Sequence, residues 1–141
     1  MRVILDTCII MDAIQNREPF AENAKNIFRA AANKWFTGCI TAKSSTDIYY
    51  LIHRCTHSDK ETRAILTKIF ILFDVVDTAG MDVRKAISAQ VSDYEDAVMI
   101  ETAIREDVDC IVTRNRKDYS KSPIPVYESG EFLRLLEGNL E

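Results

Sequence analysis

The sequence predicts a single α/β domain, a three-layer α/β/α sandwich with a central, mainly parallel sheet. Short apolar segments that resemble strands alternate with longer segments whose apolar residues recur every three or four positions, as in helices. Strands this short and apolar are typical of a parallel sheet that is buried on both faces. The 141 residues contain no repeat, linker or low-complexity stretch, so we expect one domain over residues 1–141.

The first half of the chain is expected to supply two strands and four helices. The expected strands cover residues 2–5 and 35–41, and the expected helices cover 8–15, 18–33, 44–55 and 58–73. The second of these helices has Pro19 in its first turn. It presents one apolar face, made of Phe20, Ala24, Ile27, Phe28 and Ala31. Ser58 and Glu61 form the capping box of the fourth helix.

The second half is expected to add three strands and three helices. The expected strands cover residues 74–77, 109–113 and 124–127, and the expected helices cover 81–90, 92–107 and 129–138. Ser92 and Glu95 match a capping box at the start of the second of these helices. Residues 114–123 are expected to form a loop, and Gly138 is expected to end the last helix.

Composition and charge favour some classes of protein over others. The chain is 47% apolar and 28% charged, which is ordinary for a soluble globular protein, and its formal net charge is −4. This charge argues against binding nucleic acid by charge alone, but not against an enzyme that meets phosphates through metal ions. A signal peptide and an apolar run long enough to span a membrane are both lacking, so we expect a soluble, cytoplasmic protein.

The four cysteines indicate reduced thiols rather than a disulfide framework. They lie far apart, without a C-x-x-C pair, at Cys8, Cys39, Cys55 and Cys110. One local cluster, His53, Cys55 and His57, contains two histidines with the spacing of one helix face. A structural zinc ion takes four ligands, so a polar helix end is the favoured interpretation of this cluster.

Several acidic residues fall where the expected strands end, which is where sites form in parallel sheets. Asp6 directly follows the first strand. Asp96 lies in the first turn of the helix 92–107, on the stripe that faces the core. Asp47 lies at the edge of the apolar stripe of the helix 44–55, and Asp118 follows the strand 109–113 together with Thr113 and Asn115.

Each acid also has a purely structural interpretation. Asp6 can cap the first helix, and Asp47 stands three residues after Ser44, as in a capping box. Asp96 and its neighbour Asp93 can favour a helix N-terminus through the macrodipole. Asp118 can be an ordinary loop residue. None of these interpretations explains why the acids converge on one end of the sheet.

Converging carboxylates repel one another, and a hard divalent cation relieves that repulsion. Ligand sets made only of oxygen select Mg²⁺ or Mn²⁺, and Mg²⁺ takes phosphate oxygens as further ligands. Such a site suits metal-assisted attack of water on a phosphodiester. The sequence contains neither a phosphate-binding glycine loop (G-x-G-x-x-G or G-x-x-x-x-G-K-[ST]) nor the G-x-S-x-G nucleophile motif.

The segments "VILDTCIIMD", "DYEDAVMIETA" and "IVTRNRKDY" resemble, in this order and spacing, the PIN domain family. The resemblance covers essentially the whole chain and is greatest to the bacterial single-domain branch that includes VapC-type toxins of type II toxin–antitoxin pairs. It implies a Mg²⁺- or Mn²⁺-dependent endoribonuclease with a PIN-like α/β/α fold. It also implies an RNA substrate, a small antitoxin partner and a homodimer.

The resemblance assigns catalytic roles to Asp6, Asp47, Asp96 and Asp118, with Asp6 and Asp96 as the metal ligands. Asp47 stands where the family usually has glutamate, so its shorter side chain is expected to reach the metal only through water. Asn115 occupies a position often held by aspartate, and Asp118 is the nearest carboxylate that could replace it.

Four positions of the matched motifs receive supporting roles or depart from the family. Thr113, Asn115 and Asp93 are expected to support the ligands. Cys8 replaces the asparagine of the family's D-T-N opening, so we expect Asp6 to be held more loosely.

The loop after the strand 109–113 also carries Arg114, Arg116 and Lys117, which are candidate contacts for the RNA backbone. A solvated basic loop is the alternative interpretation. The antitoxin is expected to cover apolar positions of the N-terminal helices, around Ile14, Phe20, Ile27 and Phe28, although amphipathic helices more often pack in a core.

Two alternative functions stay open at this stage. The substitutions at Cys8, Asp47 and Asn115 favour a catalytically weakened RNA-binding or scaffolding domain, which would bind Mn²⁺ poorly. The other alternative is a nuclease that acts without an antitoxin.

Overall fold

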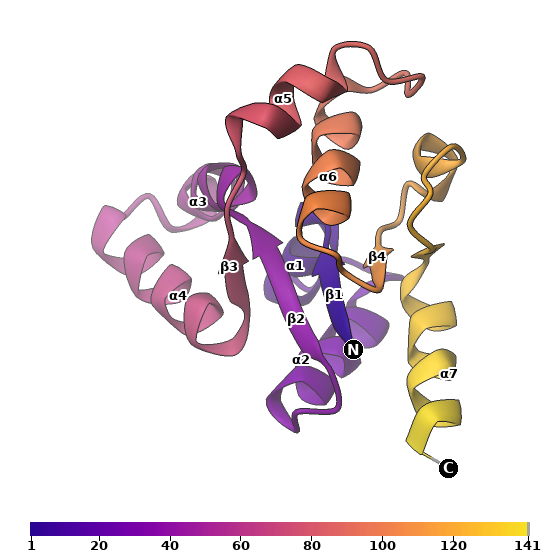
Figure 1. Ribbon diagram of the computed structural model, residues 1–141. Helices are drawn as coiled ribbons and strands as arrows, with labels where there is room; N and C mark the ends of the chain where they lie inside the picture. Colours follow the sequence, from indigo (N-terminus) through magenta and orange to yellow (C-terminus); the bar gives the residue numbers. More distant parts are fainter. Residues whose placement is uncertain (141) are drawn as a thin grey trace.

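The computed structural model describes residues 1–140, in which five parallel strands form one sheet (Figure 1). The strands are β1 (Arg2–Leu5), β2 (Thr37–Thr41), β3 (Asp74–Val76), β4 (Cys110–Val112) and β5 (Val126–Tyr127). Their order across the sheet is β3-β2-β1-β4-β5, and every neighbouring pair is parallel. The predicted parallel sheet is confirmed.

Helices cover the sheet on both faces, so the three-layer α/β/α prediction is confirmed. The helices are α1 (Thr7–Ile14), α2 (Ala21–Ala32), α3 (Ala42–Thr56), α4 (Asp59–Leu72), α5 (Gly80–Ala86), α6 (Tyr94–Arg105) and α7 (Ser129–Leu140), with the short 3₁₀ helix η1 (Arg116–Tyr119). In Figure 1, α6 lies in front of the sheet, whereas α1 and α2 lie behind it. No helix in the described part is long and apolar enough to cross a membrane.

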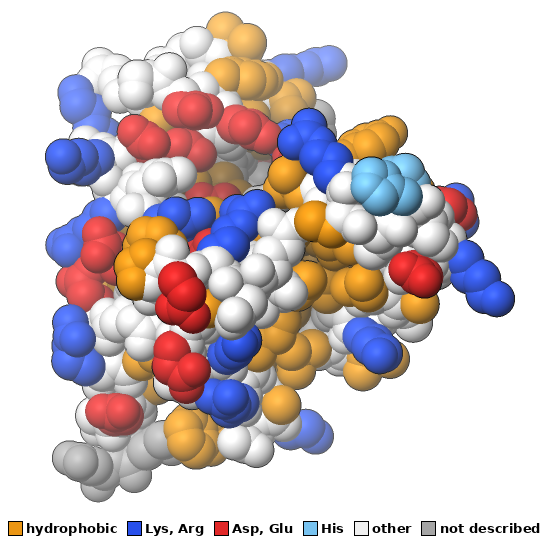
Figure 2. All heavy atoms as spheres, turned by 180° about the vertical axis from the view of Figure 1, so that it is seen from behind, with side chains coloured by type: hydrophobic (Ala, Val, Ile, Leu, Met, Phe, Trp, Pro, Cys, Tyr) orange, Lys and Arg blue, Asp and Glu red, His pale blue; other side chains and the backbone are white. Residues whose placement is uncertain are grey.

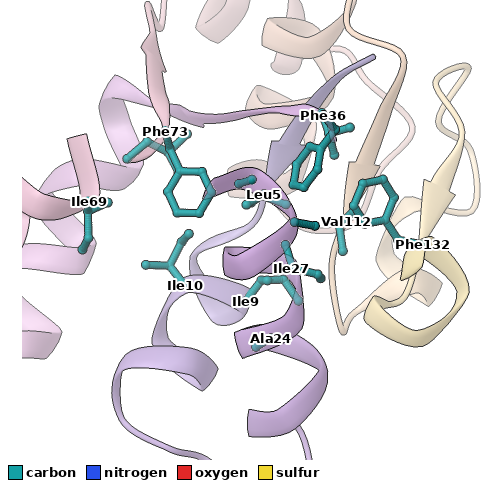
Figure 3. Close-up of a cluster of buried hydrophobic side chains, with 14 of the residues drawn as sticks. Leu5, Ile9, Ile10, Ala24, Ile27, Phe36, Ile69, Phe73, Val112 and Phe132 are labelled. Atoms are coloured by element: carbon teal, nitrogen blue, oxygen red, sulfur yellow. The ribbon is translucent and has the colours of Figure 1, made fainter. Parts of the chain in front are cut away.

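The pleat of the sheet sends alternate side chains into two cores. Val3 and Leu5 of β1 join the larger core, whereas Ile4 between them joins the smaller one against α6. Figure 3 shows the larger core, in which side chains of α1, α2, α4 and α7 meet the sheet. The rings of Phe36 and Phe132 pack edge to face there, with their centroids 5.0 Å apart.

Gly38 in β2 allows a close approach between the sheet and this core. A Cβ atom at position 38 would lie 2.5 Å from Cδ1 and 2.9 Å from Cε1 of Phe73. The Phe73 ring is itself almost fully buried and packs edge to face on Phe28, with centroids 5.0 Å apart. A larger residue at position 38 would therefore require the ring to move.

Two helices begin at other capping residues than predicted. Asp93, and not Ser92, is the N-cap of α6, because its carboxylate accepts the backbone N–H of Glu95 at 2.9 Å. Helix α3 begins directly after β2, where the hydroxyl of Thr41 accepts the backbone N–H of Ser44 at 3.2 Å. The Ser44 capping box considered for Asp47 is therefore wrong, and the Asp47 side chain is available for other contacts.

Other segment ends also differ from the prediction. Pro19 lies in a turn before α2, which begins at Ala21. Helix α7 continues through Gly138 to Leu140, so this glycine does not end it. Residues 116–119 of the predicted loop wind into η1, because backbone N–H groups bond back along the chain, such as Asp118 to the carbonyl of Asn115 at 2.9 Å.

The strand order places a topological switch point between β1 and β4. From β1 the chain goes to β2 and β3 on one side, and then returns to β4 and β5 on the other. The backbone N–H of Asp6, directly after β1, donates to the carbonyl of Val112 at the end of β4, at 3.0 Å. Ligands of open parallel sheets bind at this point, and Asp6 and the loop after β4 therefore lie where a ligand is expected.

Candidate functional site

A pocket of about 480 Å³ opens at the carboxyl edge of the sheet. Its walls come from the β1–α1 junction, α3, the start of α6 and the loop after β4. The sequence-predicted acids that line it are Asp6, Asp47, Asp93, Asp96 and Asp118, and Asn115 lines it too. Figure 2 shows acidic side chains around a recess in the surface, with lysine and arginine side chains beside it.

Asp6 is held at both carboxylate oxygens. Its Oδ1 accepts the backbone N–H of Thr7 at 2.7 Å, so Asp6 caps α1 as one interpretation predicted. Its Oδ2 accepts the hydroxyl of Thr113 at 2.7 Å, and that hydroxyl also accepts the backbone N–H of Asn115 at 3.1 Å. Thr113 is fully buried. These bonds fix the Asp6 carboxylate without help from an asparagine at position 8. The cysteine at that position makes only a long contact, with its Sγ 4.0 Å from Thr113 Oγ1.

Asp96 is positioned by a tyrosine that the sequence did not single out. The hydroxyl of Tyr119, from η1, donates to Asp96 Oδ1 at 3.0 Å. The Tyr119 side chain is only 2% exposed. Its burial, with the charges of Asp6 and Asp96, raises the pKa of the Tyr119 hydroxyl, so Tyr119 remains a proton donor in this contact.

Burial disfavours the ionised forms of both acids, and neighbouring negative charges add to this effect, that of Glu95 at Asp6 and that of Asp6 at Asp96. Burial raises the pKa of the Asp6 carboxyl above its ordinary value, and the bonds from Thr113 and Thr7 counteract part of this rise. Burial, together with the negative charges of Asp93, Asp6 and Asp118, raises the pKa of Asp96 to about 6 despite the Tyr119 bond. The pair therefore lies in a region of negative potential.

Asp47 is engaged in a local ion pair at the rim of the pocket. Its Oδ2 lies 2.7 Å from Lys43 Nζ, one helical turn away on α3. The same ammonium contacts the carboxylate of Glu95 on α6. Lys43 thus bridges two helices and neutralises acids beside the centre, whereas Asp6 and Asp96 have no lysine, arginine or histidine of the described residues as an ion-pair partner.

Two of the three basic candidates in the loop after β4 have ion-pair partners inside the protein. Arg114 Nε lies 2.9 Å from Asp12 Oδ2 of α1, without the alignment of a hydrogen bond, and its guanidinium stacks on the Phe20 ring. Arg116 contacts both carboxylate oxygens of Glu131, at 2.9 and 3.0 Å. Lys117 is exposed and lines a neighbouring depression instead of the acidic pocket.

The pair of Asp12 and Arg114 is itself a finding that the sequence did not predict. The Asp12 side chain is 1% exposed and the Arg114 side chain 31%. Burial raises the pKa of the Asp12 carboxyl, and the charge of Arg114 opposes that rise. The pair ties α1 to the loop that carries Thr113 and Asn115, so Arg114 serves to position this loop.

The structure gathers the predicted acids around one pocket but does not form a finished cage for a metal. Among the described residues, no three His, Cys, Asp or Glu side chains lie close enough together to hold a metal ion, which applies to the cluster at His53 as well. The four cysteines are free thiols, as expected. A cation at Asp6 and Asp96 would take its other ligands from water and phosphate, as Mg²⁺ commonly does.

The apolar groove predicted on the N-terminal helices is mostly closed by the core. Ile27 is fully buried, and Phe28 packs on Phe73. Ile14 packs against the same core, and Phe20, at 40% exposed, lies under the Arg114 guanidinium. Ile14, Ile27 and Phe28 are used inside the domain because α2 packs mainly against α1 and α7, and to a smaller extent against α4.

Comparisons with known proteins agree on the fold. Residues 2–117 match the model of a family described as PIN domain. Among curated proteins no match was found. A chain of VapBC2 from Rickettsia felis, solved bound to a DNA fragment from its promoter, is 17% identical with a TM-score of 0.67, covering 91% of this chain and 98% of that chain.

Two other solved structures have similar chains at low identity. For DNA-bound VapBC from Salmonella typhimurium the identity is 16% and the TM-score 0.65, covering 92% of this chain and 98% of that one. VapC20 of Mycobacterium tuberculosis is described as a Sarcin-Ricin loop cleaving toxin. Its identity to this chain is 12% and the TM-score is 0.59, covering 77% of this chain and 86% of that one. With its family match over most of its length and the switch-point site described above, the chain belongs to the PIN domain family.

Proposed function

We propose that this protein is a metal-dependent endoribonuclease whose centre is the pair Asp6 and Asp96. One observation carries the proposal: the buried acids elsewhere have arginine partners, whereas these two have hydroxyl partners. Asp12 pairs with Arg114, and Asp82, which is 1% exposed, pairs with Arg105. A hydroxyl orients a carboxylate without cancelling its charge, so the pair is left to attract a cation from solution.

The donor set fits Mg²⁺ or Mn²⁺. Carboxylate oxygens of Asp6 and Asp96 would hold the ion, which supplies a polarised water and neutralises charge on a phosphodiester. Thr113 and Tyr119 hold the two carboxylates in place, and the Lys43 bridge keeps Asp47 and Glu95 from adding their full charge. Asp118 and Asp93, exposed at the mouth, add negative potential that attracts further water or cations.

RNA is the proposed substrate, and toxin action with a small antitoxin is the proposed setting. The structures of similar fold include toxin–antitoxin complexes and a toxin that cleaves the sarcin–ricin loop, which supports both parts of the proposal. The predicted homodimer and cytoplasmic location remain predictions, which sedimentation and cell fractionation would check.

The deciding experiment is cleavage of a panel of structured RNAs with Mg²⁺, Mn²⁺ or EDTA. Wild type is compared with Asp6→Asn and Asp96→Asn, and with Asp74→Asn as a control for the loss of an exposed carboxylate away from the site. We expect cleavage that needs metal, is lost in both site variants and persists in the control. Cleavage that survives in EDTA or in Asp6→Asn would reject this centre.

A second function, an RNA-binding domain without catalysis, is favoured by the sparse ligand set. Asp47 is neutralised by Lys43, and Asn115 stands where a further acid would be useful. Asp6 and Asp96 are thus left as the partly buried carboxylates, while Asp93 and Asp118 are exposed at the mouth. Calorimetric titration with Mn²⁺ separates the two functions. Binding that is lost in Asp96→Asn supports the nuclease, whereas no binding by wild type together with no cleavage supports the non-catalytic domain.

A further inference from the structure

The pocket continues past the carboxylates along one face of α3, where its chemistry changes. Asp47, Tyr50, Leu51 and Arg54 all line it. Positions three, four and seven residues apart share one helical face. With a rise of 1.5 Å per residue, Arg54 lies about 10 Å further along the helix axis than Asp47. The face therefore leads from the acidic centre to an aromatic ring and then to a guanidinium.

Tyr50 is strongly exposed to solvent for an aromatic residue. Its side chain is 64% exposed, more than any other aromatic side chain in the described part of the chain. It meets the Tyr49 ring edge to face, with centroids 5.3 Å apart. Tyr49 in turn donates its hydroxyl to Asp59 and stacks on His53. The neighbours thus support the Tyr50 ring while most of its surface stays exposed to solvent.

Two arginines stand at the same end of the pocket. Arg54 is exposed and forms no ion pair with the described residues. Arg17 donates through Nε and Nη2 to Gln15 Oε1, at 3.1 and 2.7 Å. Gln15 in turn donates to the backbone carbonyl of Leu51 on α3 at 3.2 Å, which holds the Arg17 guanidinium beside that helix. Two guanidinium groups therefore line the pocket beside Tyr50, in addition to the ammonium of Lys43.

We propose that this face, named here the Tyr50 track (Tyr50, Leu51, Arg54 and Arg17), binds unpaired nucleotides next to the scissile phosphate. The Tyr50 ring stacks on one base, and the two arginines contact phosphates. Aromatic rings and guanidinium groups together form the sites that hold single-stranded RNA. The two arginines and the continuity of this face with the carboxylates of the proposed metal centre favour a phosphodiester chain over a protein as the occupant. The inference rests on the proposed ribonuclease function.

The test measures binding of a fluorescein-labelled, unstructured RNA dodecamer of mixed sequence by fluorescence anisotropy. The full chain carries Asp6→Asn so that the RNA stays intact, and titrations are made at several salt concentrations. Tyr50→Leu and Arg54→Gln are compared with Trp35→Leu and Arg134→Gln, which change an exposed aromatic residue and an exposed arginine outside the pocket.

We expect Tyr50→Leu to weaken binding about 5- to 150-fold, the range for loss of one stacked base, with an unchanged salt dependence. Arg54→Gln should lower the slope of log affinity against log salt by about 0.7, the value for one phosphate contact on a single strand. The control variants should bind as the parent does. Thermal melting of each variant separates lost contacts from lost folding.

The Tyr50 track is refuted if both pocket variants bind the dodecamer as tightly as the parent does. It is also refuted if the parent shows no binding of the dodecamer at the lowest salt concentration. Equal losses in the control variants would also refute it, because the effect would then belong to the whole surface. Metal-dependent cleavage by wild type is measured separately. If cleavage persists while the variants bind normally, this inference fails and the proposed function stands.

Discussion

Replacing Asp96 by asparagine should stabilise the fold at neutral pH, because the site carboxylate is ionised there against the preference of its surroundings. The pKa of Asp96 rises from 3.8 to about 6, about two units. At about 1.4 kcal/mol per unit, ionisation costs the folded state up to about 3 kcal/mol. Asp96 is half-buried and solvent screens part of the repulsion, so we expect about 1–3 kcal/mol.

The sign of the pH dependence follows from proton binding. Between about pH 4 and 6 the folded state holds the Asp96 proton more tightly than the unfolded chain, so stability falls as pH rises through that window. Asparagine cannot titrate, and its carbonyl oxygen still accepts the Tyr119 hydroxyl. The gain from Asp96→Asn should therefore be near zero at pH 3.5 and complete at pH 7.5.

Urea unfolding followed by circular dichroism, in EDTA at several pH values, measures this difference. Asp74→Asn, on an exposed carboxylate, should show little change at any pH. A variant that is no more stable than wild type at pH 7.5, or a gain that is independent of pH, would refute the reasoning. Adding Mn²⁺ should stabilise wild type more than the variant, by about 1.4 kcal/mol at ten times the dissociation constant.

Three further changes test other parts of the structure. Arg114→Met should destabilise the fold by about 3–5 kcal/mol in urea unfolding, because Asp12 is left buried and unpaired; a loss below about 1 kcal/mol would contradict the ion pair. Gly38→Ala should cost about 1–3 kcal/mol through its clash with Phe73, and Phe73→Leu in the same chain should recover part of it. Thr113→Val should weaken Mn²⁺ binding about 10- to 100-fold in calorimetry while the circular dichroism spectrum is kept; unchanged affinity would show that its hydroxyl is dispensable.

The sequence was sufficient to predict the layers and the position of Asp6 because these depend on local patterns. A short apolar strand followed by an acid predicts a residue at the carboxyl edge, and the parallel sheet brings Thr113 beside it. The start of α3 was mispredicted because Thr41 caps the helix with no intervening loop. Residues that end a strand and begin a helix at once give no separate turn signal.

The partners of buried charges could not be predicted from the sequence. Asp12 lies in an apolar helical pattern, and nothing nearby in the chain indicates that Arg114 will neutralise it. Lys43 joins Asp47 to Glu95 only because α3 and α6 border the same pocket. Tyr119 ends the segment "IVTRNRKDY", yet its role depends on η1, whose winding turns the ring inward to Asp96.

The hydroxyl partners of the central acids explain how rigidity and negative charge can coexist. An arginine beside Asp6 would hold it as well as Thr113 does, but would also lower its attraction for a cation. Thr113 and Tyr119 fix two carboxylates while leaving their charge in place, and the fold loses stability for it. The free energy gained in Asp96→Asn at neutral pH therefore measures the cost of keeping this carboxylate ionised, chiefly in its partly buried position and then beside other negative charges. A bound cation would offset that cost, which links the stability measurement to the proposed chemistry.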